Sequence, residues 1–326
     1  MMIERIHWID LLKGLGIFFV ILGHTIKNND LYVWIYSFHM PLFFFISGYL
    51  TEPRNSIKDY NQYIWKKCKN LLFPFFIFRI LLVFYWLIVE QYFRPLDLGP
   101  IWFLIVLFGV EILIAPILLK WKQIKIYLVV FVGCIISFYM FKAIDTNISF
   151  LQKIFGWLAR FANGGLWFYL AFIIRKIERK ISCSYQYNFI ILIFAAISIF
   201  CCKYNGDVSI YSNRINNIIL YLIFGLSGIG MISFLCKHII KKHYWIEWIG
   251  NYTIIILAVH EPIKRIILKL ISIFFNEDIY IIQSNIFMAL FIAFVVLLLC
   301  IPVIYLFKYL KKHLGKIGTL LLNFVR

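Results

Sequence analysis

The sequence predicts an all-α fold, namely a polytopic membrane helix bundle with about ten transmembrane helices. Of its 326 residues, 63% are apolar or aromatic and only 15% are charged, whereas soluble domains average roughly 45–50% and 25%. The apolar residues also form long runs, each close to the about 20 residues that a helix needs to cross a bilayer. A soluble globule could not bury this much apolar surface, and disordered chains contain far fewer apolar residues than this sequence does.

Ten runs are candidates for membrane-spanning helices, and the fifth and seventh are the shortest. They are Trp8–Ile26, Leu31–Leu50, Phe73–Phe93, Pro100–Leu119, Ile126–Phe141, Phe161–Ile177, Asn188–Cys202, Ile215–Cys236, Trp245–Leu268 and Asn285–Tyr309. The stretch Lys142–Ala162 is amphipathic, so it could lie on the membrane surface or re-enter the bilayer. We find no repeat and no low-complexity linker, and therefore expect one membrane domain over residues 1–326.

The charges between the runs predict the orientation of the chain, because Lys and Arg are retained on the cytoplasmic side. With the N- and C-termini cytoplasmic, the inner segments hold 21 Lys and Arg residues and the outer segments nine. No small-residue cleavage site follows Thr25, so we interpret the first run as a retained span and not a signal peptide. The net charge of +18 is explained by inner loops beside anionic lipid, and no nucleic-acid partner is expected.

The first span carries a stripe of polar residues, and such residues inside a membrane are costly and often functional. Asp10 and Lys13 are three positions apart and are therefore neighbours on a helix. Lys13 and His24 are eleven apart, which places them on the same face, roughly 16 Å apart along the axis. Two interpretations stay open. The stripe is either catalytic, or an interfacial ion pair with a histidine that hydrogen-bonds a neighbouring helix.

These residues resemble the opening of the membrane acyltransferase 3 family, which includes fucose 4-O-acetyltransferase-like proteins. That family begins with an acidic residue, a basic residue, ten intervening residues and a His. Four further stretches agree in order: Phe38–Tyr49, Lys66–Phe75, Ile101–Leu104, and Gly250–Thr253 followed by Val259 and His260. The chain departs from the family in having Lys13 where Arg is frequent, and Asn70 in an otherwise all-Lys cluster. Lysine keeps the charge but lacks the bidentate fork of arginine.

The resemblance implies an O-acyltransferase that moves an acyl group, most simply acetyl, from cytoplasmic acyl-CoA to a hydroxyl of a cell-surface or lipid-linked sugar. It also implies a multi-pass protein of a bacterial plasma membrane, which modifies an envelope polysaccharide with acetyl-CoA as the donor. Histidine suits proton transfer at neutral pH, so His24 could act as general base, or it could carry the acyl group itself. Asp10 and Lys13 complete the catalytic set that we predict.

Acyl-CoA is strongly anionic, so its binding site should be basic and cytoplasmic. We predict Lys66, Lys67, Lys69 and Arg79 as donor-binding residues. The alternative for the three lysines is that they are ordinary positive-inside anchors. Arg79 matches Glu111 in predicted depth on the neighbouring span, so the two could instead form a structural ion pair.

The acceptor side is predicted to involve His39, Trp102, Glu111 and His260. For His39 the alternative is a buried histidine with satisfied hydrogen bonds, and for Trp102 a place in the interfacial aromatic belt. No HExxH motif, CxxC pair or carboxylate cluster offers a metal site, so no metal is predicted. The main rival function is a multi-span transporter or flippase for a polysaccharide precursor. A polysaccharide polymerase is a weaker one, because the outer connections 142–160 and 269–284 are modest.

Overall fold

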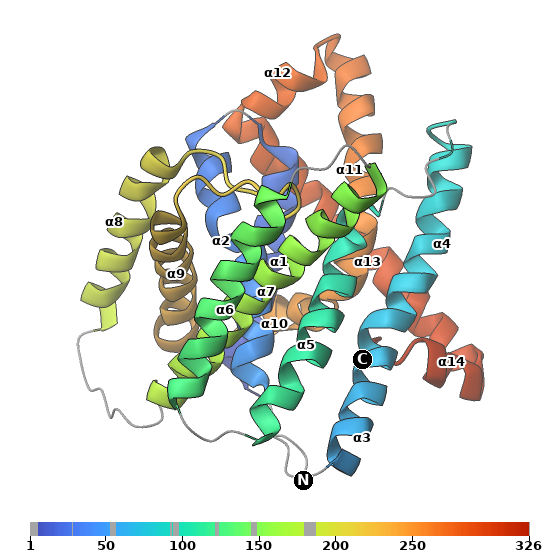
Figure 1. Ribbon diagram of the computed structural model, residues 1–326. Coiled ribbons are helices and arrows are strands. Elements are labelled where there is room, and N and C mark those ends of the chain that lie inside the picture. The colour runs from blue at the N-terminus through green and yellow to red at the C-terminus, as the bar shows by residue number, and fades with distance from the viewer. Residues whose placement is uncertain are drawn as a thin grey trace. The chain divides into compact units, whose positions relative to one another are not determined.

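The computed structural model confirms the all-α class (Figure 1). It describes residues 6–27, 29–52, 57–91, 93, 98–120, 124–144, 149–178 and 187–325, and within these it contains helices and one isolated bridge between Ser209 and Arg214 but no β-strand. The chain forms two compact units, each made of separate segments. Unit 1 comprises residues 1–35, 66–105 and 235–326, and unit 2 comprises residues 36–65 and 106–234.

The helices of unit 1 are α1 (His7–Thr25), α4 (Phe73–Ile88), α10 (Tyr244–Asn251), α11 (Thr253–Phe275), α12 (Ile279–Ser284), α13 (Ile286–His313) and α14 (Gly315–Leu321). Unit 1 also holds the short η1 (Cys68–Leu72), η2 (Gly99–Ile101) and η3 (Leu235–Ile240). Those of unit 2 are α6 (Ile124–Ala143), α7 (Ser149–Glu178), α8 (Tyr187–Asn205) and α9 (Ile218–Phe234). The unit boundaries fall within α2 (Asp30–Leu50), α3 (Ile57–Lys67) and α5 (Trp102–Lys120).

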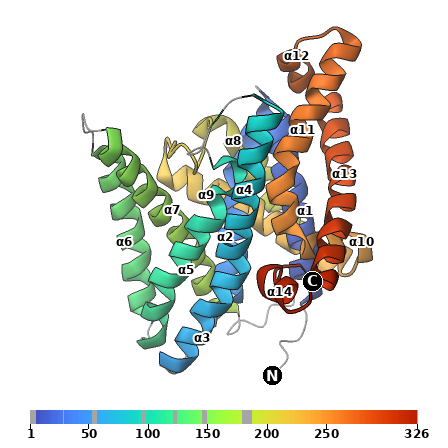
Figure 2. The same ribbon diagram turned by 90° about the vertical axis from the view of Figure 1, so that its right-hand side faces the viewer.

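Helix α1 is the centre of unit 1, where it packs against α10, α11 and α13. Glycines allow the close approach of α1 and α10. A Cβ atom at Gly14 would lie 2.2 Å from the carbonyl oxygen of Ile246, and one at Gly250 would lie 1.9 Å from that of Asp10. Small residues permit such backbone contacts between membrane helices. α10 and α12 lie near opposite ends of α1 (Figures 1 and 2).

Unit 2 is built from the helix pairs α6–α7 and α8–α9. Its core contains a chain of buried hydrogen bonds. The Trp167 indole donates to the Tyr221 hydroxyl at 2.6 Å, and this hydroxyl donates to Asn163 at 3.0 Å. Gly48 of α2 lies against the backbone of Phe168, where a Cβ atom would come within 2.0 Å of the carbonyl oxygen. These contacts join α7 to α9 and α2 to α7 in the interior of unit 2.

The basic stretch before α4 forms a single π-helical turn, η1, instead of continuing as an α-helix. Pro74 explains this turn, because proline lacks an N–H and its ring collides with the carbonyl four residues earlier, here that of Asn70. The backbone N–H of Phe73 therefore bonds to the carbonyl of Cys68, five residues back. Turns of this kind are frequent at functional sites, and this one carries Lys69.

A helix covers most of each of the ten predicted spans, but the extents differ at several of them. The stretch 149–162, predicted as a surface or re-entrant segment, is continuous with the sixth span in the single 30-residue helix α7. The predicted span Trp245–Leu268 is interrupted at Tyr252, whose φ of −112° and ψ of 20° separate α10 from α11. The backbone leaves helical geometry two residues after Gly250, which packs tightly against α1.

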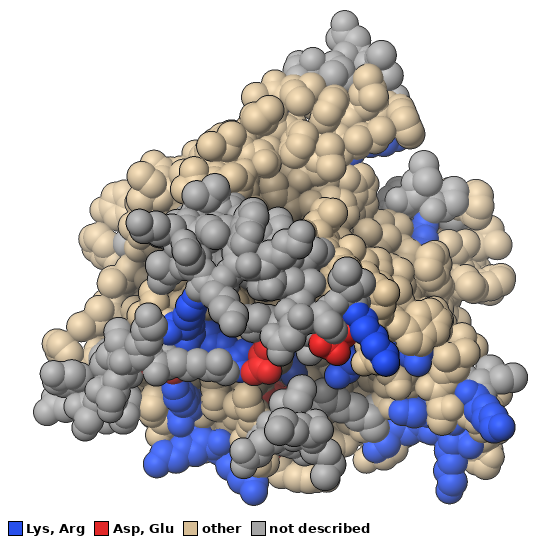
Figure 3. Space-filling view, turned by 60° about the horizontal axis from the view of Figure 1, so that its bottom comes forward, with Lys and Arg blue, Asp and Glu red and all other residues tan. Residues whose placement is uncertain are grey.

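Six helices of the described residues are long and apolar enough to cross a membrane. They lie at His7–Thr25, Asp30–Leu50, Lys58–Ile88, Phe150–Glu178, Ile218–Ile240 and Ile286–His313. Helix α11 has 23 residues but also four charged ones between Glu261 and Lys269. Ten spans and cytoplasmic termini therefore stay predictions, and Arg54, Arg94, Arg179 and Lys180 lie outside the described residues. Lys and Arg side chains cover more of the face in Figure 3 than Asp and Glu do.

Candidate active site

The end of α1 that carries His24 is held in place by two side chains from distant helices. The last carbonyls of a helix have no partner within it. Here the Lys264 ammonium of α11 donates to the His24 carbonyl at 3.0 Å, and the Gln283 amide of α12 donates to the Thr25 carbonyl at 2.8 Å. A cation at this position also complements the negative end of the helix dipole. These two contacts, both within unit 1, fix the backbone at His24.

The imidazole of His24 lies beside that of His260 in α11, with ring centroids 5.2 Å apart and planes inclined by 49°. His24 is partly exposed, whereas His260 is fully buried. Nδ1 of His260 lies 3.0 Å from the carbonyl oxygen of Ile256. Since a carbonyl can only accept, Nδ1 carries the proton and Nε2 of the neutral ring carries a lone pair. That Nε2 is buried and makes no hydrogen bond within the part of the chain that the structure describes.

A carboxylate completes the cluster. The side-chain ligand atoms of His24, His260 and Glu261 all lie within 4.8 Å of one another. Glu261 accepts from Lys264 at 2.7 Å through one oxygen and from Arg265 at 2.9 Å through the other. The charge of this buried acid is therefore compensated, which burial in an apolar helix bundle requires.

This arrangement suits proton transfer better than metal binding. The three groups are close enough to hold a metal ion, but both oxygens of Glu261 already face cations, and a divalent ion would have to compete with them. Two adjacent imidazoles beside a compensated carboxylate can instead hold, pass and stabilise a proton. His24 and His260 were both predicted as site residues, but because they are far apart in sequence and on different helices, the sequence did not place them side by side.

The other end of the polar stripe is an ion pair. Nζ of Lys13 donates to Asp10 at 3.2 Å, as their spacing predicted. Asp10 is buried and Lys13 is partly exposed, with 20% of its side chain accessible. Nearby, Nδ1 of His7 lies 2.7 Å from the buried carboxylate of Glu247 in α10. Both ends of α1 thus combine histidine, lysine and acid in contact with a second helix.

The sequence matches the acyltransferase domain of the membrane acyltransferase 3 family over residues 6–306. The chain belongs to this family. The matched region contains every predicted site residue and supports a membrane O-acyltransferase in general terms. No curated protein and no solved structure matches the chain.

The four residues predicted to bind acyl-CoA lie in unit 1, between the end of α3 and the middle of α4. Lys66 is exposed at the end of α3, whereas Lys67 and Lys69 are partly exposed. Arg79 lies further along α4 and is also partly exposed. The π-helical turn changes the direction of the side chains here, because it inserts an extra residue into the helix. The assignment of these four residues to acyl-CoA stays a prediction.

Of the predicted acceptor residues, only His260 is seen beside His24. His39 lies in unit 2, is buried, and packs against the ring of Tyr36 at 4.6 Å. Glu111 is also in unit 2, where it is buried and accepts from the Tyr63 hydroxyl at 2.9 Å. Arg79 belongs to unit 1, so its pairing with Glu111 stays a prediction. Trp102 is buried in unit 1 next to Phe103.

Sequence reasoning missed three side chains around His24. Glu261 belongs to the cluster, and Lys264 and Gln283 hold the end of α1. The sequence contained a clue to two of them, because Glu261 and Lys264 are charged residues three positions apart in a predicted span. Such spacing indicates a pair on one helix face, and charges within a span indicate function. The sequence contained no such clue to Gln283, because its hydrogen bond to α1 depends on how α12 folds back.

Proposed function

We propose that this protein is a membrane O-acyltransferase that moves an acyl group, most simply acetyl, from cytoplasmic acyl-CoA to a hydroxyl of a cell-surface or lipid-linked sugar. His24 is the reacting side chain. The observation that carries the proposal is the position of His24, which lies beside His260 and Glu261 on a helix end fixed by Lys264. We further propose that the membrane is the plasma membrane of a bacterium.

In the general-base route, the His24 imidazole takes the proton of the sugar hydroxyl while its oxygen attacks the thioester carbonyl. The carbon–sulfur bond breaks, and the departing CoA thiolate takes the proton from the imidazolium. In the acyl-carrier route, the imidazole nitrogen attacks the thioester, and CoA leaves as a thiolate that takes up the imidazole proton. The hydroxyl then attacks the acyl-imidazole, and its proton passes to the released imidazole nitrogen. Both routes pass through a positive charge on His24, which the Glu261 carboxylate stabilises.

His260 acts as a positioning residue in either route. Its Nδ1 proton is fixed on the carbonyl of Ile256, so its Nε2 presents a lone pair in the cluster. This lone pair can accept a hydrogen bond from the protonated imidazole of His24 and so hold the orientation of the ring. The full burial of His260 keeps water from competing for that contact.

The remaining predicted residues have roles on the two substrates. Lys66, Lys67, Lys69 and Arg79 meet the phosphates of acyl-CoA, since lysine and arginine bind phosphate through charge-assisted hydrogen bonds. Lys13, next to Asp10, meets the pantetheine arm along α1. The residues His39, Trp102 and Glu111 contact the acceptor sugar.

The test is acyl transfer by membranes that contain the wild-type protein or one of two variants, with labelled acetyl-CoA and chemical analysis of the glycan. His24→Gln should abolish the label, whereas His313→Gln, which changes an exposed histidine at the end of α13, should leave it unchanged. Both variants must be present in the membrane in equal amounts by immunoblot. Normal labelling with His24→Gln would refute the assignment.

Two further measurements separate the alternatives. Without acceptor, the acyl-carrier route should leave label on the purified protein that hydroxylamine removes, and the general-base route should leave none. Transport of a sugar precursor by purified protein that consumes no acetyl-CoA would favour the transporter or flippase instead.

A further inference from the structure

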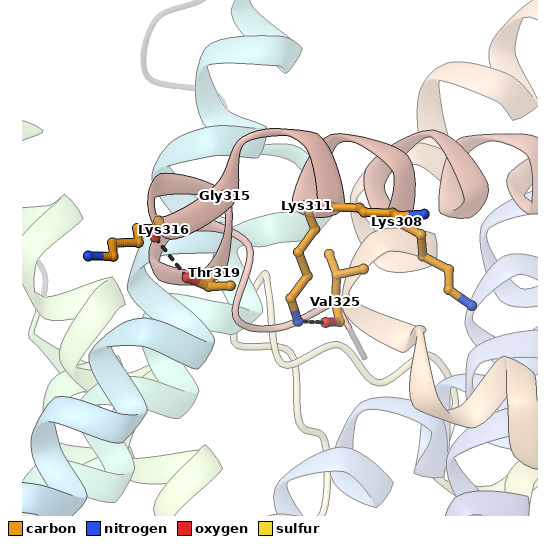
Figure 4. Close-up of a pocket in the computed structure, with 7 residues that line it drawn as sticks. Lys308, Lys311, Gly315, Lys316, Thr319 and Val325 are labelled. Carbon is orange, nitrogen blue, oxygen red and sulfur yellow. Dashed lines mark hydrogen bonds between the residues drawn. The ribbon is translucent and has the colours of Figure 1, made fainter.

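The end of α13 and the short helix α14 enclose a basic hollow of about 540 Å³ (Figure 4). α13 ends at His313, and Gly315 with a φ of +53° reverses the chain. Such a φ is readily adopted only by glycine. The chain then returns toward α13, where Val325 lies beside Lys311 (Figure 4). The hollow is lined by Lys308, Lys311, Lys312, Gly315, Lys316, Thr319 and Val325.

Four lysines line this hollow, and none of them forms an ion pair with a carboxylate of the described residues. Two are held in place by other contacts. The Lys311 ammonium donates to the Val325 carbonyl, and that of Lys308 lies 5.4 Å from the ring centre of Tyr252. Four positive charges around one hollow, which no carboxylate of the described residues lines, make it electropositive and attract anions.

The hollow lies close to the predicted donor-binding lysines. Phe324 packs against Phe78 of α4, with ring centroids 5.7 Å apart. The amide of Asn323 donates to Asn70 in η1 at 2.7 Å, directly after Lys69 in the chain. The C-terminal residues therefore connect the lysines of α13 and α14 to the π-helical turn. Residues 307–326 lie outside the region that matches the family.

We propose that this hollow binds phosphate groups. Lysine binds phosphate as a point charge, and four lysines line this one hollow. Such phosphates have two sources at a membrane surface, the soluble donor CoA and the headgroup of an anionic phospholipid. The proposal concerns the phosphate chemistry that both share, and it holds whether or not the chain transfers acyl groups.

The test uses the full chain, purified into phosphatidylcholine nanodiscs, and a double variant, Lys312→Gln/Lys316→Gln. These two lysines are exposed and make no structural contact in the described residues, so the fold should persist. The matched control is Lys241→Gln/Lys242→Gln, which removes two exposed lysines of the same unit outside the hollow. One arm measures CoA binding by calorimetry, with dephospho-CoA as comparison. The other counts phosphatidylglycerol molecules retained in native mass spectrometry.

Removal of two phosphate-binding lysines should weaken binding about ten- to thirty-fold in at least one arm. A loss confined to CoA, and smaller for dephospho-CoA, identifies the donor as the ligand, and a loss confined to phosphatidylglycerol identifies the lipid. A loss in both arms shows that the hollow accepts either. If the double variant matches the control in both arms, the proposal is wrong. A wild-type chain that binds no CoA refutes the proposed function but leaves the lipid arm decisive.

Discussion

Replacing Gly250 by alanine should separate α10 from α1. The added Cβ atom would lie 1.9 Å from the carbonyl oxygen of Asp10, where ordinary contact begins at 3.4 Å. The two backbones must therefore move apart by about 1.5 Å at this point, because the atom in the way belongs to a helix backbone. Inserting a methyl group into a packed core usually costs about 1–3 kcal/mol, and a clash with backbone belongs at the upper end.

The assay is the thermal stability of the solubilised protein, followed by fluorescence-detected size exclusion after heating. Gly250→Ala should lower the midpoint by several degrees and reduce acyl transfer, since Asp10 and Lys13 lie at the same contact. The matched control is Gly133→Ala in α6, where the new Cβ atom has no neighbour within 4 Å. This control should be neutral, or slightly stabilising by helix propensity. Equal midpoints for the two variants would refute the close packing of α1 and α10.

Three further changes test single contacts. Glu261→Gln should lower kcat for acyl transfer about a hundred-fold with KM for acetyl-CoA unchanged, and a change in KM alone would show that Glu261 acts on binding. Gln283→Ala leaves the carbonyl of Thr25 without its donor and should lower stability by about 1 kcal/mol, measured by the same heating assay; an unchanged midpoint would contradict this. Tyr63→Phe removes the hydroxyl that donates to buried Glu111 and should destabilise by about 1–3 kcal/mol, whereas equal stability would show that this hydrogen bond adds nothing to the stability of the fold.

The spacing of residues along the sequence predicted contacts within one helix, but it could not predict contacts between helices. The Asp10–Lys13 ion pair follows from a separation of three residues. The approach of His260 to His24 depends on how α11 packs against α1, for which the sequence contains no periodic signal. The interruption at Tyr252 was missed because the prediction followed the long apolar runs on either side, although Gly250 and Asn251 directly before Tyr252 are residue types that often mark a break.

The distribution of buried charge is the strongest physical reason to place function on α1 and its partners. Among the described residues, five charged side chains are buried, namely Asp10, Glu111, Glu247, Glu261 and Lys264. Four of them belong to α1, α10 and α11. Even when paired, a buried charge costs several kcal/mol that apolar residues of similar volume would avoid.

A chain that needed only a stable membrane anchor could fill these positions with leucine. Instead, α1 is held at both ends by polar side chains, through the contact of His7 with Glu247 of α10 and through Lys264 and Gln283 beside His24. Polar contacts of this kind fix a helix in rotation and in axial position, which apolar packing does less strictly. Such precision agrees with the proposed function, in which the imidazole of His24 must meet a reacting atom, and under that proposal replacing Lys264 by methionine should impair acyl transfer more than stability.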